Sequence, residues 1–452
     1  MRILDNCGVV TNDSSRLIHN EGAAIAIDRD RIVAIGTAEE IRDQYPNAER
    51  IDMTGKIAFP GFVNSHTHTV LTVLRGLAED QGPHSLYGQM YPMKTVIEDQ
   101  HRHALGMLGS VDTLRSGTTT MVENYEGSTA VAPAAEKLGI RAVISEVAND
   151  AVMVNIRRGR YEFSEEQGQE QLDAVEAHIK NWHGAANGRI TTQASAHAPD
   201  TCSRDLLRKV IDIAEKHDVG LHIHLAQTPR EVQQVQQREG MGSVEFLHSV
   251  GFLGPQLIAA HCVYINPREI QLLGKSGTTV AHNALMNGRR GKVAPTMHLE
   301  AAGANIALGS DNMHEDMVAV ARTALVVNRI READGSIPSS HDVLDWLTMG
   351  GARSLGMEDD IGSLEVGKKA DITLVDFRQP HLQPLIDPVV NFVHNANARD
   401  VHTVLVDGEV VVRDGKTVNV DEDEVIDNAN EMARDFWRKF QAQYGGTVMP
   451  ER

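Results

Sequence analysis

Hydrophobic and polar residues follow one pattern at the two ends of the chain. Residues 1–57 contain short runs rich in β-branched residues, such as 22–28, separated by polar turns. Such runs predict short strands and hairpins. A similar pattern returns near the C-terminus, where 400–412 reads as a hairpin around an Asp-Gly turn. Neither end has enough strands for a core of its own, so we expect 1–57 and 356–452 to form one composite β domain, a small β-sandwich.

The pattern differs between residues 58 and 355, where strand-like apolar runs alternate with helix-like runs. Such alternation predicts parallel βα units. About eight units over these ~300 residues fit a (β/α)8 barrel better than an open doubly wound sheet. The predicted fold class is therefore α/β, with a TIM barrel of residues 58–355 and a small β domain built from both termini.

Two histidines end the first predicted strand of the barrel. His66 and His68 are separated by one residue at the end of the apolar run that follows Pro60-Gly61. Successive side chains of a strand point to opposite faces, so these two project the same way and can bind one metal ion.

Other histidines and one aspartate occupy the same kind of position further along. They stand at or just past the ends of later predicted strands and are His197, His224, His261, His282 and Asp311. The carboxyl ends of barrel strands meet on one face, where active sites are built. Three histidines and a carboxylate suit zinc or ferrous iron with room for a water. The metal lowers the pKa of that water to ~7, and a further neutral histidine can shuttle its proton.

Composition and charge exclude several other classes of protein. The net charge of −19 argues against nucleic acid and anionic membranes as partners. Three widely spaced cysteines give no disulfide framework and point to a reducing compartment. We find no signal peptide and no apolar run near the ~20 residues that span a bilayer. We therefore expect a soluble, cytoplasmic protein that acts on a small molecule.

Seven motifs give the chain a resemblance to a known family. They follow the family's order and are PGFVNSHTH at 60–68, SAHAPDTCS at 195–203, HIHLAQT at 222–228, AAHC at 259–262, VAHN at 280–283, LGSDN at 308–312 and IGSLEVGKKADI at 361–372. With these motifs the chain resembles the amidohydrolase superfamily, in the branch of adenosine-homocysteine-type and guanine-type deaminases and triazine hydrolases.

The resemblance implies a role for each of the strand-end residues. It implies one divalent metal, zinc or alternatively iron, held by His66, His68, His224 and Asp311. His261 would orient and deprotonate the attacking hydroxide, with Asp311 as its partner. The expected substrate contacts are His197, Gln227, His282 and Asn312, although His282 fits a structural role equally well. We expect His222 to pack beside the ligands or to support them. Because these barrels often pair, we also expect a homodimer.

One residue departs from the deaminase pattern. That pattern has a glutamate three residues after the third metal histidine, where this chain has Gln227. An amide cannot act as an acid or base at neutral pH. Glu123, at a predicted strand end, is either a substitute proton carrier or a residue of the wall. No lysine stands at an obvious strand end to bridge two metals, which favours one ion.

Several functions stay open. The first is hydrolysis of a C–N bond of amino, amide, urea or carbamate type in a small nitrogenous compound such as an N-heterocycle. The alternatives are an aromatic deaminase, a triazine-type chlorohydrolase, and a non-catalytic binding protein on a barrel scaffold. We expect the loops 76–100 and 284–297 to line the pocket that would separate them.

Overall fold

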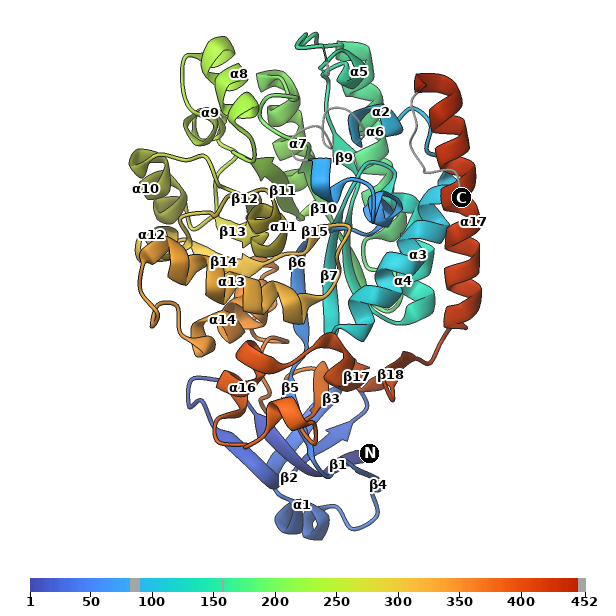
Figure 1. The fold of residues 1–452 in the computed structure, drawn as a ribbon, viewed down its shortest axis with the longest axis vertical. Coiled ribbons are helices and arrows are strands. Elements are labelled where there is room, and N and C mark those ends of the chain that lie inside the picture. Colours follow the sequence, from blue (N-terminus) through green and yellow to red (C-terminus); the bar gives the residue numbers. More distant parts are fainter. Residues whose placement is uncertain (82–89, 157, 446–452) are drawn as a thin grey trace.

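The structure, a computed structural model, describes residues 1–81, 90–156 and 158–445. Figure 1 shows a ring of strands and helices above a second sheet that holds the N-terminus. The helices are α1 (Ala38–Gln44), α2 (Tyr91–Met93), α3 (Asp99–Arg115), α4 (Ala132–Leu138), α5 (Met153–Ile156), α6 (Glu165–Trp182), α7 (Arg204–His217), α8 (Pro229–Glu239), α9 (Ser243–Val250), α10 (Pro267–Ser276), α11 (Ala284–Arg289), α12 (Thr296–Ala301), α13 (Met317–Glu332), α14 (Ser340–Leu347), α15 (Met349–Ser354), α16 (Pro388–Asn395) and α17 (Glu422–Tyr444). Short 3₁₀ turns span Thr69–Leu74, Glu79–Gln81, Ser128–Ala130, Pro380–Leu382 and Ala398–Asp400.

Strands from both termini form one sheet, as the sequence pattern predicts. Its order is β19 (Lys416–Thr417), β18 (Glu409–Arg413), β17 (Val401–Val406), β16 (Ile372–Asp376), β5 (Lys56–Pro60), β1 (Arg2–Val10), β2 (Ile18–Asp28) and β3 (Arg31–Thr37), and β4 (Glu49–Asp52) pairs with β1. The two termini meet where β16 runs antiparallel to β5. The bounds of an independently folding composite domain, 1–57 with 356–452, stay a prediction.

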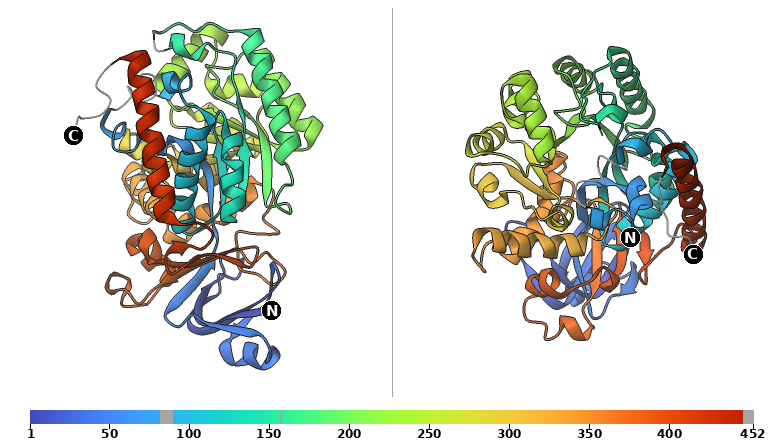
Figure 2. Two further views of the ribbon diagram at one scale, coloured as in Figure 1. Left: turned by 90° about the vertical axis from the view of Figure 1, so that its right-hand side faces the viewer. Right: turned by 45° about the horizontal axis from the view of Figure 1, so that its top comes forward.

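The middle of the chain forms the predicted barrel. Its parallel strands are β6 (Phe62–His68), β7 (Thr118–Asn124), β8 (Arg141–Ser145) with β9 (Val147–Ala148), β10 (Ile190–Ala196), β11 (Gly220–Leu225), β12 (Leu257–His261), β13 (Thr279–His282) and β14 (Asn305–Leu308) with β15 (Asp311–Asn312). Both β8 and β9 pair with β10, and β15 returns to pair with β6. The ring therefore closes with eight strand positions, and Figure 2 shows the helices around it.

The last helix of the chain leaves the terminal sheet and packs on the barrel. Figures 1 and 2 show α17 lying along α3. The indole Nε1 of Trp437 donates to the backbone oxygen of Val73 at 3.0 Å, and Lys439 pairs with Glu98 at 2.7 Å. The helix is amphipathic, and its apolar side chains Phe436, Trp437 and Phe440 are buried.

A buried ion pair joins the barrel to the terminal sheet. The guanidinium of Arg141, on β8, contacts Asp371 at 3.1 Å and Asp407 at 2.5 Å. The side chains of Arg141 and Asp371 are 3% and 2% exposed. Removing one partner of a buried pair costs about 3–5 kcal/mol, because the other charge is left unpaired. The two parts therefore depend on each other for stability.

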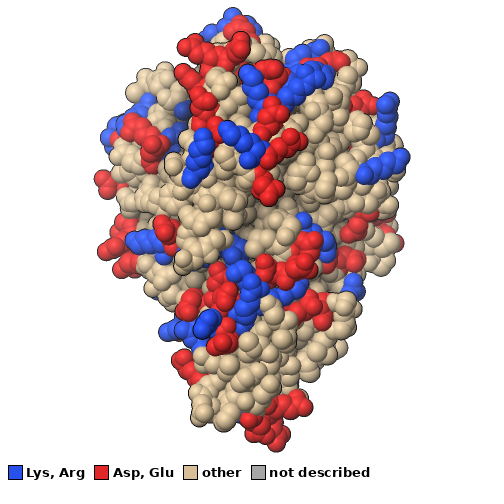
Figure 3. Space-filling view, turned by 180° about the vertical axis from the view of Figure 1, so that it is seen from behind, with Lys and Arg blue, Asp and Glu red and all other residues tan. Residues whose placement is uncertain are grey.

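The outer face of the molecule carries charges of both signs. Figure 3 shows Lys and Arg lying among Asp and Glu on the rear face, without an extended basic area. The total of 43 Lys and Arg against 62 Asp and Glu is acidic, which does not favour binding to nucleic acid. Among the described residues no helix is long and apolar enough to cross a bilayer.

Two buried carboxyl groups hold the outward-facing side of β6. Thr67 donates to Glu315 Oε2 at 2.6 Å, and Thr69 donates to Glu123 Oε2 through its backbone N–H at 2.8 Å and its hydroxyl at 2.6 Å. Burial raises the pKa of Glu123 to about 8 and that of Glu315 to about 7, against these hydrogen bonds, which lower them. Glu123 therefore points away from the barrel interior and fixes the chain just after His68.

Glu123→Gln tests this buried carboxyl group. The pKa of Glu123 is about 8 in the folded chain and near 4.3 in an unfolded one. Between these values the folded chain keeps a proton that the unfolded chain has lost, so the carboxyl group destabilises the fold as pH rises. Unfolding free energies measured from pH 5 to 8 should show wild type losing up to about 1.4 kcal/mol per pH unit relative to Glu123→Gln. The exposed Glu170→Gln should leave the slope unchanged, and parallel slopes for Glu123→Gln and wild type would contradict this assignment.

Candidate metal centre

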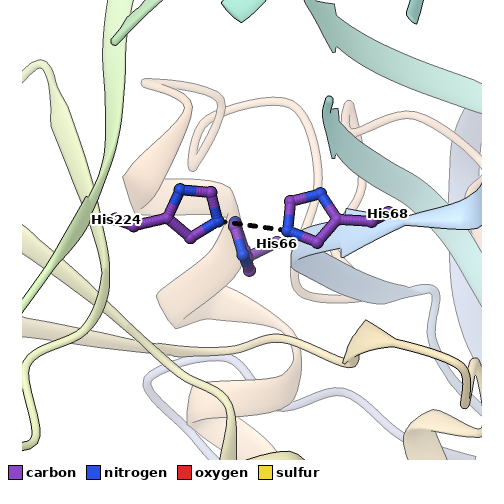
Figure 4. A group of neighbouring side chains, drawn as sticks. All are labelled: His66, His68 and His224. Carbon is purple, nitrogen blue, oxygen red and sulfur yellow. Dashed lines mark hydrogen bonds between the residues drawn. The ribbon is translucent and has the colours of Figure 1, made fainter. Parts of the chain in front are cut away.

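Three histidines from two strands converge inside the barrel. His66 and His68 come from β6 and His224 from β11, and their ligand atoms lie within 4.8 Å of one another. Figure 4 shows the rings of His68 and His224 facing each other, with their Nε2 atoms 3.1 Å apart, and His66 between them. All three are at most 6% exposed. The alternation of strand residues explains why Thr67, between the two histidines of β6, faces the opposite way.

Asp311 adds a carboxylate to this group. Its Oδ1 lies 3.6 Å from His68 Nε2 and 3.9 Å from His66 Nε2. Its Oδ2 lies 4.0 Å from His261 Nε2, and His261, Asp311 and His66 form a second cluster of ligand atoms within 4.8 Å. Asn312 Nδ2 donates to Asp311 Oδ1 at 2.9 Å and so fixes the carboxylate plane.

The histidines offer lone pairs rather than positive charges. Burial, together with repulsion between neighbouring rings, holds the pKa values of His66 and His68 well below 6.5 and lowers that of His224 to about 4. The imidazoles are therefore neutral at pH 7, and their contacts with Asp311 are not ion pairs.

The donor atoms fit a divalent metal. Two ligands at ~2.0–2.1 Å from a tetrahedral zinc lie about 3.3 Å apart, close to the 3.1 Å between His68 and His224. His66 Nε2 is buried without a hydrogen-bond partner, which is costly unless something else binds it. Three nitrogens and one carboxylate are also the donor types that zinc takes.

Hydrogen bonds on the far side of the rings select the ligand tautomers. His224 Nδ1 donates to the backbone oxygen of His197 at 2.7 Å. His66 Nδ1 lies 2.9 Å from His222 Nε2, and His222 Nδ1 lies 3.3 Å from the side-chain oxygen of Gln193. Since that amide oxygen can only accept, His222 carries its proton on Nδ1 and accepts from His66 on Nε2. His222 therefore supports His66 rather than acting as a ligand.

His261 is neutral and held in one orientation. Its Nδ1 lies 3.1 Å from Asn287 Oδ1 and 3.3 Å from Asn283 Nδ2, and its Nε2 lies 4.0 Å from Asp311 Oδ2. Burial, with the nearby Arg290 guanidinium, lowers the pKa of His261 to about 3. His261 and Asp311 both have left-handed backbones, with φ of 79° and 69°. Such conformations cost of order 1–3 kcal/mol each and occur where side-chain direction matters.

A cavity opens above these residues. It has an empty volume of about 510 Å³, part of it open to solvent. Three of the four predicted substrate contacts line it, namely His197, Gln227 and Asn312. The fourth, His282, is not among the lining residues, and it accepts a hydrogen bond from Asn328 at 3.2 Å.

The loops expected to line the pocket contribute to it. Met90, Tyr91 and Lys94 come from the segment 76–100 and Arg290 from 284–297, while residues 82–89 lie outside the described part of the chain. The buried carboxylate of Glu231 accepts from the backbone N–H groups of Ala226 and Gln227 at 2.7 and 2.8 Å. Gln227 is thereby held at the cavity wall.

Glu123, which the sequence left open as a substitute proton carrier or a residue of the wall, lies near the end of β7. Glu123 is not a pocket residue, because it faces the outside of the barrel. Asn124 and Glu126 line the cavity instead. Along β7 the inward positions have even numbers, which separates Asn124 from Glu123. Tyr125 and Glu126 line the cavity from just beyond the end of the strand. Lys94 and Arg290 also line the cavity, and no periodic pattern marks either of them.

The likeness to known proteins covers nearly the whole chain. The sequence profile of the amidohydrolase family matches residues 57–411. The chain belongs to the amidohydrolase family. A shorter match, over residues 23–48, is to the imidazolonepropionase-like composite domain of bacteria.

Curated relatives within this family are deaminases. A 5-methylthioadenosine/S-adenosylhomocysteine deaminase of Desulforudis audaxviator is 35% identical over 416 residues, which are 91% of this chain and 94% of the relative. A 5'-deoxyadenosine deaminase of Methanosarcina barkeri is 32% identical over 447 residues, 97% of this chain and 99% of the relative.

Solved structures agree with this assignment. An adenosine deaminase from Xanthomonas campestris with bound zinc has a TM-score of 0.88 at 26% identity and covers 97% of this chain and 98% of its own. The atrazine chlorohydrolase of Arthrobacter aurescens, at 21% identity, a TM-score of 0.84 and 96% and 100% coverage, shares the fold. The amidohydrolase described here is thus a hydrolase, and its histidines and aspartate suit a divalent metal.

His222→Phe tests the support of His66. The variant keeps a ring of similar size but cannot accept the proton of His66 Nδ1, so the ligand tautomer is no longer fixed. Loss of such a supporting contact costs about 10–100-fold in metal affinity. Zinc release to a chromophoric chelator should therefore be faster by a similar factor. The exposed His248→Phe should release zinc at the wild-type rate, and an unchanged rate in His222→Phe would refute the assignment.

Proposed function

We propose that this amidohydrolase cleaves a carbon–nitrogen bond in a small nitrogenous compound, an N-heterocycle or a related molecule. The observation that carries the proposal is the convergence of His66, His68, His224 and Asp311, of which the last three line the cavity. His261 Nε2 lies 4.0 Å from Asp311 Oδ2. Neutral nitrogen donors, a carboxylate and a neighbouring neutral base are what hydrolysis by an activated water needs.

We further propose that one divalent metal, zinc, occupies this centre with those four residues as its ligands. A metal bound there supplies a water whose pKa is low enough for it to ionise near pH 7. Two groups of the chain stand ready for the proton that leaves this water. His261 Nε2 and Asp311 Oδ2 are 4.0 Å apart, so either atom can hold the proton and return it to the departing nitrogen.

Gln227 favours a carbonyl-type bond among the possible substrates. It lines the cavity, and its amide can donate and accept hydrogen bonds but cannot deliver a proton. Deamination of an aromatic ring needs a proton on a ring nitrogen as well as on the leaving group. An amide, urea or carbamate needs only the proton on the leaving group, which His261 and Asp311 can supply.

Deamination of an amino-heterocycle is the second candidate, and the deaminase relatives favour it. A carboxylate does exist in the cavity, because Glu126 lines it. It is engaged at 2.5 Å by Lys94, so a proton route through it would have to include that lysine. Triazine-type dechlorination is the third candidate.

A product screen separates these candidates. Zinc-loaded protein is incubated with amino-heterocycles, ureas, carbamates and chlorotriazines, and products are identified by mass together with assays for ammonia and chloride. We expect amine or ammonia release from a compound with a hydrolysable C–N bond. Chloride release alone would overturn the proposal, and turnover of none of the compounds would favour a binding protein.

His261→Ala should separate proton transfer from metal binding. We expect the variant to keep one zinc per chain and to lose about 10²–10⁴-fold in kcat, the usual contribution of a general base. Elemental analysis and steady-state rates measure the two effects. His224→Ala is the matched control and should lose the metal. Because His261 also lies within reach of Asp311 and His66, equal metal loss in both variants would make His261 a ligand instead.

Gln227→Glu tests whether proton delivery is missing at this position. On an amide, urea or carbamate substrate we expect no increase in kcat, since the change adds a charge to a partly buried wall without supplying a needed proton. The same variant should gain activity on amino-heterocycles. A rise of tenfold or more in the native reaction would show that proton delivery limits it.

Two sequence-based expectations, a homodimer and a cytoplasmic location, remain predictions. Light scattering coupled to size-exclusion chromatography tests the first, and fractionation of cells that express the protein tests the second.

A further inference from the structure

The cavity is less acidic than the rest of the molecule. The chain has a net charge of −19, yet the charged residues that line the cavity are two cations, Lys94 and Arg290, and two acids, Glu126 and Asp311. What matters for a ligand is which of these charges are already neutralised.

Lys94 is neutralised by a neighbour in the cavity wall. Its Nζ lies 2.5 Å from Glu126 Oε2, and the two side chains are 9% and 26% exposed. At this distance the two charges offset each other, although neither atom has a hydrogen-bond partner among the described residues. The pair can orient a ligand by hydrogen bonds, but it presents no net charge.

Arg290 has a more distant carboxylate neighbour. Its nearest carboxylate oxygen is Asp311 Oδ2, 3.8 Å from Nη1, which is beyond hydrogen-bond distance. Within the described residues its guanidinium makes no hydrogen bond to a side chain or to the backbone. The side chain is only 25% exposed, so water compensates the charge incompletely.

Asp311 cannot fill this role in the loaded enzyme. Its Oδ1 faces His66 and His68, where the negative charge offsets a dication. Arg290 then keeps an unpaired positive charge at the wall of the cavity, beside the two atoms to which we assign proton transfer. Burial raises the pKa of Asp311, and the Arg290 guanidinium opposes that rise. Burial and then the same guanidinium lower the pKa of His261.

We propose that Arg290 anchors a negatively charged oxygen of the substrate, either a carboxylate or an ionised ring oxygen next to the bond that is cleaved. This inference rests on the proposed function and narrows its substrate class to anionic nitrogenous compounds. A guanidinium presents a planar fork of N–H donors that matches two oxygens. Arg290 belongs to the same cavity wall as Gln227 and Asn312, which can hold the nitrogen edge of such a compound.

The substrate charge also accounts for Gln227. A glutamate at that position would place a second carboxylate in the cavity that receives the anion, and like charges there repel. A neutral amide keeps the hydrogen-bonding capacity without the repulsion. The change at Gln227 and the presence of Arg290 therefore point to the same property of the ligand.

Equilibrium binding to the zinc-loaded full chain tests this inference without requiring turnover. The probes form two matched pairs, pyrimidine-4-carboxylate with pyrimidine-4-carboxamide and barbiturate with uracil. Within each pair the two compounds are similar in shape and differ in charge. The anion of the first pair carries a carboxylate, and the anion of the second pair carries an ionised ring oxygen. Titration calorimetry is done on wild type, Arg290→Met and Arg289→Met. Arg289 is the matched control, since it is adjacent in sequence, exposed and absent from the cavity lining.

We expect wild type to prefer the anionic member of at least one pair. Arg290→Met should lose about ten- to hundredfold in affinity for that anion and little for its neutral partner, while Arg289→Met should match wild type. Zinc content and thermal unfolding verify that the variants are folded and loaded. Anion affinity that survives in Arg290→Met would mean that the anion binds elsewhere, and equal losses for both members would mean a structural role. Either result overturns the inference.

The outcome is distinguishable from failure of the proposed function. Charge-selective binding through Arg290 without hydrolysis of any anionic compound in the product screen would overturn the function and leave the anchor. Hydrolysis of neutral compounds without any charge preference would leave the function and overturn the anchor.

Discussion

The candidate metal centre depends on the closure of the barrel, where the last strand segment, β15, pairs with the first strand, β6. Parallel pairing of β15 with β6 places Asp311 opposite Thr67 and Asn312 opposite His68, so the carboxylate and two histidines come together from chain positions over 240 residues apart. Behind this junction Glu315 accepts from Thr67 and from Ser310 at 2.6 and 2.8 Å. One buried carboxyl group thus holds both strands, and the same closure fixes the distances between the donor atoms.

Close packing at the junction leaves little freedom for substitution. A Cβ added to Gly309 would lie 2.3 Å from Asn283 Oδ1 and 3.0 Å from His66 Cβ, so only glycine lets β14 turn into β15 this close to a ligand. The left-handed backbone of Asp311 follows two residues later. The strain is stored where the side chain must aim at the centre, and the buried hydrogen bonds around it compensate the cost.

The sequence predicted those site residues whose positions follow the alternation of side chains along strands or the ends of strands. Strand alternation and strand ends predicted the positions of His66, His68, His224, His261 and Asp311, and the structure brings them together. The same alternation, applied to β7, excludes Glu123 from the interior, but Glu126 lies beyond the strand end and carries no such signal. Lys94 follows α2 and Arg290 follows α11, and neither position carries a periodic signal. Long-range packing, rather than local pattern, places these two cations in the cavity, and it also determines the left-handed backbones.

The net charge that the cavity presents to a ligand depends on which of its charged side chains already have a partner of opposite charge. Burial keeps the histidines neutral, and Glu126 neutralises Lys94. Among the described residues of the cavity lining, Arg290 is the cation without a close carboxylate, because Asp311 lies 3.8 Å away and also faces the ligand nitrogens. In a protein with a net charge of −19, a positive cavity wall is a local property of the site and not of the surface. Substitution of glutamine for an acid at Gln227 acts in the same direction. The chain therefore combines the scaffold of the amidohydrolase family with a cavity in which we assign Arg290 to an anionic ligand.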